Sequence, residues 1–217
     1  MRVKALLLSL VLVLAVRGAN PALNRILFAP TAYTLEKGEI VFSVYEVIFP
    51  SLTFGITDSF DVAGGMAFLP GISGFIDNFT MYYLAPKFRF YKTENLAISA
   101  GGLLVGVIGG GYEGFGYAVL TTGSVEKYFT VGLAMPFSGK ETFSHMIMFL
   151  GGKLPLSSKF SLVGESYLIT GLFTLISPGL RFSTGNLAVD LGVMYNIIGG
   201  GDKVPLPWFG FSYKFSI

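Results

Sequence analysis

Hydrophobic and polar residues alternate with a period of two along most of this chain. In residues 186–195 every odd position holds a large apolar side chain, while the even positions hold Asn186, Ala188, Asp190, Gly192 and Met194. A period of two predicts a β-strand with one apolar face and one mixed face. When such strands follow one another in hairpins, the pattern is typical of a barrel whose apolar face meets lipid.

Turn residues divide the chain into twelve such segments. Tight polar connections, such as 57–59 and 184–185, alternate with longer connections rich in Gly and Pro, such as 70–78 and 197–205. With both termini beside the tight turns the strand number is even. We therefore predict an all-β, antiparallel transmembrane β-barrel of about 12 strands, with 10 or 14 as alternatives. The expected strands are 39–49, 51–57, 60–69, 79–91, 95–108, 114–122, 127–136, 144–154, 159–169, 174–183, 186–196 and 206–216.

Two prolines, Pro86 and Pro178, fall inside expected strands. Proline removes a hydrogen-bond donor from the strand ladder, so we expect a local bulge at each. Each proline also opens a repeated unit of strand, polar turn and strand, over 86–98 and 178–189. Both convergence on one hairpin and duplication of a hairpin explain this repeat, and both are compatible with a barrel.

The first 19 residues are expected to be a signal peptide. Arg2 and Lys4 precede a 12-residue apolar run over 5–16, which is too short for a transmembrane helix. Small residues follow, so cleavage is expected near Gly18 or Ala19. A retained N-terminal anchor is the alternative.

Residues 20–38 alternate poorly, because Pro21, Pro30 and the polar 36–38 interrupt the pattern. We interpret this stretch as a periplasmic lead-in segment. The alternative is that it folds into the lumen as a plug. The barrel itself is then expected over residues 39–217.

Composition narrows the class of protein. The apolar fraction is 52% and the charged fraction only 13%, which favours burial in lipid as well as in protein. Three of the 15 basic groups lie in the signal segment and none of the 13 acidic groups does, so the remaining chain is nearly neutral and no basic patch suggests nucleic acid. The chain has no cysteine, which excludes disulfides, thiolate metal sites and a lipidated N-terminal cysteine.

The apolar set of each strand is expected to face lipid. Examples are Phe129, Val131, Leu133 and Met135 in one strand and Phe115, Tyr117 and Val119 in another. The small residues of the other set would leave room inside a modest barrel. Aromatic residues gather beside the tight turns, which is typical of a girdle at one membrane interface. These aromatics are Phe54, Phe60, Phe88, Phe90, Phe129, Phe160, Phe182, Tyr213 and Phe215.

Charged residues within the strands are expected to face inward, since a charge on the lipid face costs several kcal/mol. Six basic groups against three acidic ones would give a pore a weak preference for anions. The same residues could instead form a salt-bridged, closed lumen. The expected lumen-lining charges are Asp61, Lys87, Arg89, Lys153, Lys159, Glu165, Arg181, Asp190 and Lys214, and the side of Glu46 stays open.

The last expected strand carries a short motif, Gly210-x-x-Tyr213-x-Phe215. This motif resembles the C-terminal assembly signal of bacterial outer-membrane β-barrels, although Ser216 and Ile217 follow the aromatic residue. The hairpin over 54–60 is also similar to those of small outer-membrane proteins, many of them of uncharacterised type. The resemblance implies the outer membrane as location, with the lipid bilayer and the assembly machinery as partners.

Candidate chemistry is sparse. His145 is the only histidine, and its neighbour Ser144 would point to the opposite face of a strand, so the two cannot form a catalytic pair there. Glycine runs at 109–111 and 199–201 lack the context of a phosphate-binding loop. We expect no cofactor, no metal and no enzymatic activity.

The leading functional hypothesis is a passive pore for small solutes. A closed structural or adhesion barrel with a filled lumen is the alternative, and a lipid-modifying outer-membrane enzyme comes third.

Overall fold

The structure is a computed structural model that describes residues 20–46, 48–69, 79–138, 146–169, 173–198 and 205–216. The expected signal peptide, residues 1–19, lies outside the described residues, as do Ser144, His145 and the glycine run at 199–201. Among the residues described, no helix is long and apolar enough to cross a membrane.

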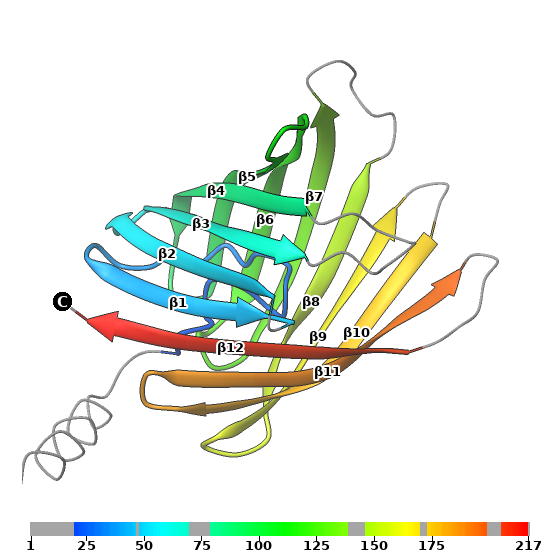
Figure 1. Cartoon of the computed structure of the whole chain (residues 1–217). Helices are drawn as coiled ribbons and strands as arrows, with labels where there is room; N and C mark the ends of the chain where they lie inside the picture. The colour runs from blue at the N-terminus through cyan, green and yellow to red at the C-terminus, as the bar shows by residue number, and fades with distance from the viewer. Residues whose placement is uncertain are drawn as a thin grey trace, which may run out of the picture.

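Twelve antiparallel strands close into a barrel in which each strand pairs with its neighbours in sequence and β1 pairs with β12 (Figure 1). The predicted strand number and fold class are confirmed. The strands are β1 (Glu39–Tyr45), β2 (Phe49–Thr57), β3 (Phe60–Leu69), β4 (Phe79–Lys92), β5 (Leu96–Val107), β6 (Tyr112–Gly123), β7 (Tyr128–Ser138), β8 (Ile147–Pro155), β9 (Phe160–Ile169), β10 (Phe173–Thr184), β11 (Leu187–Ile198) and β12 (Leu206–Ser216).

The predicted alternation of short and long connections places the barrel ends. Tight turns join β2 to β3, β4 to β5, β6 to β7, β8 to β9 and β10 to β11. The start of β1 and the end of β12 lie at the same end of the barrel as these turns (Figure 1). We call this the tight-turn end and the opposite end the loop end.

The first hairpin differs from the prediction. Strand β1 ends at Tyr45, and β2 begins at Phe49, so the turn precedes Pro50 rather than lying at it. Glu46 adopts a positive φ of 51°, a conformation that ends the strand. Its carboxylate accepts a hydrogen bond from the backbone N–H of Phe209 at 2.9 Å, so Glu46 ties this turn to β12.

The bulges expected at the two prolines are absent. The register of β4 against β5 is the same before and after Pro86, and that of β10 against β11 is the same before and after Pro178. The register instead shifts elsewhere, between Arg89 and Tyr91 and between Thr174 and Leu175. Glycines opposite the residue after each proline let the backbones approach closely, since a Cβ at Gly101 or Gly192 would lie within 2.7 Å of the proline carbonyl.

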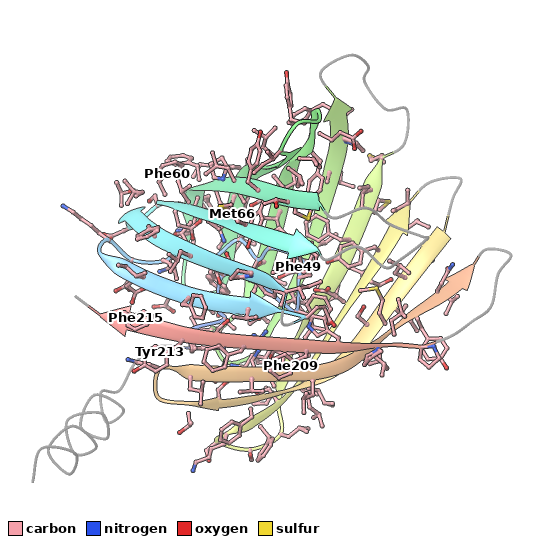
Figure 2. All side chains as sticks on the ribbon, in the orientation of Figure 1. Phe49, Phe60, Met66, Phe209, Tyr213 and Phe215 are labelled. Atoms are coloured by element: carbon pink, nitrogen blue, oxygen red, sulfur yellow. The ribbon has the colours of Figure 1, made fainter. Side chains whose placement is uncertain are left out.

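Large apolar side chains cover the outside of the barrel, as predicted for most strands. Phe54, Phe88, Phe129, Phe160 and Phe215 are each about half exposed and lie near the tight-turn end. The Tyr213 and Phe215 rings lie side by side on β12, with centroids 4.8 Å apart, and Figure 2 labels both near the C-terminus.

Strand β6 is oriented opposite to the prediction. Val119 is buried inside the barrel, and Phe115 and Tyr117 pack against the same interior cluster. Gly116 and Ala118 are the residues exposed on the outer face. The apolar set of β6 packs against protein rather than lipid, because the lumen here contains an apolar filling.

That filling is residues 20–38, which we call the plug. The segment enters the lumen, turns at residues 26–29 and returns to β1, with Arg25 bridged to Pro30 (Figure 1, dark blue). The interpretation as a lead-in outside the barrel is wrong, and the alternative, a plug, describes the segment. The plug backbone forms hydrogen bonds with side chains of the wall and not with a neighbouring strand. It therefore needs no alternation of apolar and polar residues. Its buried apolar side chains are Ala22, Ile26, Leu27, Ala29, Ala32, Tyr33 and Leu35.

Candidate functional site

Asp190 anchors the plug to the wall through two arginines. Its carboxylate accepts hydrogen bonds from Nε and Nη2 of Arg181 at 2.6 and 3.0 Å and from Nη1 of Arg25 at 3.0 Å. Asp190 and Arg181 are fully buried, and Arg25 is 5% exposed. Arg181 also donates to the carbonyls of Ala22 and Ile26, so the wall pair holds the entering arm of the plug up to the start of its turn.

Register explains why Arg181 and Asp190 meet. They are direct partners across the β10–β11 hairpin, so both side chains stand on the same face of the sheet. A Cβ at Gly210, the partner of Asp190 on β12, would approach the Asp190 carboxylate to 3.3 Å. The glycine therefore leaves room for the carboxylate and its two arginines.

Glu165 holds the tip of the plug. Its carboxylate accepts backbone N–H groups from Leu27, Phe28 and Ala29, each at 3.0 Å to Oε2, and the Tyr167 hydroxyl at 3.0 Å to Oε1. Three converging amides are a strong complement to a buried carboxylate. No Lys or Arg within 4.0 Å pairs with Glu165 among the residues described, so backbone dipoles and Tyr167 compensate its charge.

Wall hydroxyls bind the returning arm of the plug. Thr121 Oγ1 accepts from the Ala32 N–H at 2.8 Å, and Ser99 Oγ donates to the Ala32 carbonyl at 2.6 Å. Tyr33 stacks edge-to-face on Tyr128 and donates to the Gly123 carbonyl at 3.1 Å. Burial raises the pKa of the Tyr33 phenol, so the ring stays neutral over the ordinary pH range.

The plug leaves the lumen at the tight-turn end. Asp61 accepts the Leu35 N–H at 3.0 Å, and Thr34 donates to the Asp58 carbonyl at 2.8 Å. Gly38, with a φ of 83°, then joins the plug to β1. The plug is thus bound by side chains of the barrel wall along its length. Its covalent connection to the barrel is at the start of β1.

Seven of the nine predicted lumen-lining charges are buried within the barrel. Arg89 is half-buried, and its Nη2 donates to the Asp58 carbonyl at 2.5 Å. Lys159 is exposed in the turn before β9, so its prediction as a lumen-lining residue is wrong; the strand starts one residue later than expected. The seven buried residues are Asp61, Lys87, Lys153, Glu165, Arg181, Asp190 and Lys214.

Each buried wall lysine has an acidic partner. Lys87 lies 3.7 Å from Asp61, Lys153 3.2 Å from Glu126, and Lys214 2.7 Å from Glu39. Neither Glu39 nor Glu126 was among the predicted residues, because one begins a strand and the other lies in a turn. Arg25 was missed since its segment was placed outside the barrel. The register of β7 against β8 pairs Lys153 with Tyr128, which places the lysine beside the turn that holds Glu126.

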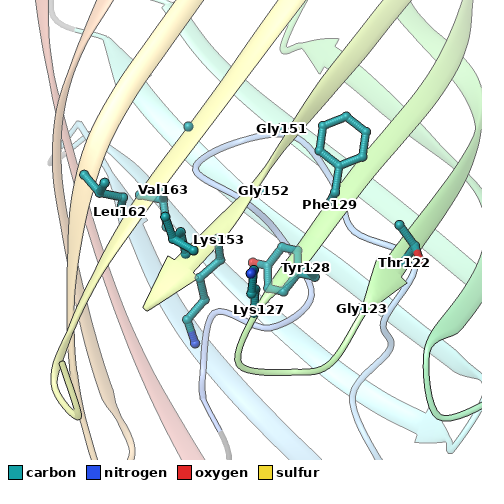
Figure 3. Close-up of a pocket in the computed structure, with 12 residues that line it drawn as sticks. Thr122, Gly123, Lys127, Tyr128, Phe129, Gly151, Gly152, Lys153, Leu162 and Val163 are labelled. Carbon is teal, nitrogen blue, oxygen red and sulfur yellow. The ribbon is translucent and has the colours of Figure 1, made fainter. Parts of the chain in front are cut away.

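A pocket of about 660 Å³ lies against β7, β8 and β9 (Figure 3). Gly151, Gly152 and Gly164 have no side chains, which leaves space at this part of the wall. The lining also includes Tyr128, Lys153 and the exposed Phe129. Its lining is mainly apolar, and Lys153 is already paired with Glu126. The pocket therefore offers few groups that could recognise a polar solute. Within the described part of the chain, no group of three or more His, Cys, Asp or Glu residues could hold a metal ion.

Gly55 tests how closely the plug fits the wall. A Cβ at Gly55 would overlap the Glu36 carbonyl, a backbone atom that cannot move aside alone. We expect Gly55→Ala to lower the free energy of unfolding by about 1–3 kcal/mol, measured as a shift of the denaturant midpoint in detergent micelles. Gly116→Ala is the matched control, because a Cβ there meets nothing within 4 Å. Equal midpoints for the two variants would contradict a tight fit at Gly55.

Comparison with solved structures reveals similarity of fold. The barrel is similar to the KdgM porin in complex with disordered oligogalacturonate, with a TM-score of 0.59 and 8% identity over 82% of this chain and 98% of that one. It is similar to a second structure of the KdgM porin, with a TM-score of 0.58 and 7% identity over the same shares. LpxR from Salmonella typhimurium aligns over 82% of this chain and all of its own, at a TM-score of 0.48 and 7% identity.

No family model and no curated protein matches the sequence. What the likeness shows is therefore the fold, a closed 12-stranded barrel of the porin type.

Proposed function

We propose that this protein is a passive channel of the bacterial outer membrane for small solutes, and that the plug blocks it in the state described. The observation that carries the proposal is the nature of the filling. The lumen is occupied by one continuous segment, residues 20–38, rather than by side chains of the wall alone. We expect such a segment to leave as a unit, with Gly38, the last residue before β1, as the joint.

The wall behind the plug supports this proposal. Its inward residues include many hydroxyls and charges, which a water-filled lumen tolerates and a permanently apolar core does not favour. The buried polar wall residues include Ser43, Ser51, Thr53, Ser99, Thr121, Thr130, Ser161, Ser177 and Ser212. The likeness of fold to porins agrees with a conducting role.

Location and assembly are further parts of the proposal. Export, insertion into the outer membrane and recognition by its assembly machinery agree with the exposed apolar belt and with Gly210, Tyr213 and Phe215 on the closing strand. The weak anion preference expected from the sequence is the most detailed part of the proposal. We expect that preference to be small, because every buried wall lysine has a carboxylate partner.

A closed structural barrel is the second candidate. It is favoured by the apolar cluster that the plug forms with β5–β8, around Ile26, Tyr33 and Phe149. The two candidates differ in whether the plug ever leaves. The proposal contains no catalytic step.

A reversible lock separates the candidates. The chain has no cysteine, so Ala32→Cys with Ser99→Cys introduces one pair, at positions where the Ser99 hydroxyl lies 2.6 Å from the backbone carbonyl of Ala32. In a planar bilayer we expect no current steps from the oxidised protein and discrete steps after reduction, because the disulfide holds the plug in place. Ala32→Cys alone is the control and should conduct under both conditions. Silence of folded protein throughout, or equal current in both redox states, would overturn a plug-gated channel.

A further inference from the structure

The tip of the plug contacts two aromatic residues of the wall near the loop end. The Phe28 ring meets Tyr45 and Trp208 edge-to-face, with centroids 6.0 and 6.1 Å apart. The Arg25 guanidinium lies over the Tyr45 ring, 4.8 Å from its centroid. The plug therefore presents an aromatic ring to both wall residues and a cation to one of them, Tyr45.

Charge in this region balances only with the plug in place. The buried charges around the turn are Arg25 and Arg181 against Asp190 and Glu165. Withdrawal of the plug removes Arg25 and the three amides on Glu165. The wall then keeps one cation against two carboxylates, and a carboxylate in such a confined site strongly favours a positively charged partner.

Two further wall groups are available for hydrogen bonds. Nε1 of Trp208 and Oγ of Ser177 are buried and have no hydrogen-bond partner among the described residues. Trp208 is 8% exposed and Ser177 is 1% exposed, and Ser177 is the strand partner of Glu165. Unsatisfied buried polar groups cost free energy, and a bound solute could satisfy them.

We propose that this stretch of wall, formed by Tyr45, Glu165, Asp190 and Trp208, is a binding site for a small organic cation that carries an aromatic ring. The tip of the plug is its built-in substitute. The solute's ammonium or guanidinium group replaces the amides on Glu165 and the charge of Arg25, and its ring replaces Phe28 between Tyr45 and Trp208. The site rests on the proposed function in one respect, since the solute reaches it only when the plug moves.

Trp208 makes the site measurable, since it is the only tryptophan of the chain. The full-length Phe28→Ala variant, in detergent micelles, removes the competing ring while keeping the plug charges; Phe28 is 51% exposed, so the barrel should still form. We expect phenylalanine amide to change Trp208 fluorescence saturably. N-acetylphenylalanine, which has the same ring and a negative charge, should bind with an affinity at least about tenfold lower. Arg25→Gln weakens the plug by removing its ion pair with Asp190, and this variant should also bind phenylalanine amide more tightly than N-acetylphenylalanine.

Glu165→Gln in the Phe28→Ala background should weaken binding of the amide about tenfold, while Glu126→Gln, which changes an exposed carboxylate, should leave it unchanged. Absence of a saturable response in both plug variants, or equal binding of the two probes, would overturn the site while leaving any conductance in place. Saturable, charge-selective binding by a protein that never conducts would keep the site and overturn the channel.

Discussion

Asp190→Ala is expected to lower the free energy of unfolding by roughly 3–5 kcal/mol, because it leaves Arg25 and Arg181 buried without their shared counter-charge. Both guanidinium groups would keep some bonds to carbonyls and to Ser212, but none to a carboxylate within the described residues. The measurement is the urea midpoint at which the compact, heat-modifiable band is lost in gel electrophoresis.

Glu126→Ala is the matched control for Asp190→Ala. It also breaks an ion pair with a buried cation, Lys153, but the Glu126 side chain is 71% exposed and water can replace it. The expected loss is below about 1 kcal/mol. If the two substitutions shifted the midpoint equally, the Asp190 cluster would not hold the plug in the way described.

Glu165→Ala is expected to release the tip of the plug while the barrel stays closed. The substitution removes the acceptor of three amides, and each buried unsatisfied N–H costs about 1–3 kcal/mol. A loss of about 3 kcal/mol raises the population of the released tip roughly a hundredfold. Trypsin reports this population, because Arg25 is buried in the native plug and becomes cleavable when the tip opens.

Cleavage after Arg25 is measured by mass spectrometry under native conditions, with the compact gel band showing that the barrel is intact. Glu36→Ala serves as the control, since Glu36 is exposed and, within the described part of the chain, its backbone N–H rather than its carboxylate takes part in a hydrogen bond. An unchanged cleavage rate in Glu165→Ala would mean that apolar packing of Ile26 and Leu27 alone holds the tip.

The barrel could be predicted from sequence because its wall obeys a local rule. Alternation identifies the strands, and the polar turns mark the hairpins. The turn between β10 and β11 lies one residue later than predicted, at 185–186, and this shift is what pairs Arg181 with Asp190. The sequence also indicates that these charges face inward, since lipid excludes them. The turn at Glu46 was misplaced because β1 is apolar on both faces and Pro50 suggested a break.

The plug could not be located by the same rule. A segment that bonds through its backbone to scattered side chains, such as Glu165, Thr121 and Ser99, leaves no periodic pattern of its own. The error at β6 has the same origin, because alternation shows which face is apolar and not whether lipid or protein covers it. Once Ile26 and Tyr33 lie in the lumen, the apolar face of β6 turns toward them.

The plug also touches the seam where the first and last strands meet. The hydroxyls of Ser43 on β1 and Ser212 on β12 are 2.7 Å apart, and Arg25 donates to Ser212 at 2.7 Å. Strand β12 is the last part of the barrel to be synthesised, whereas Arg25 precedes every strand. Ring closure is therefore a joining of opposite ends of the chain, and the Arg25 bond to Ser212 adds the plug to the contacts that fasten the final strand.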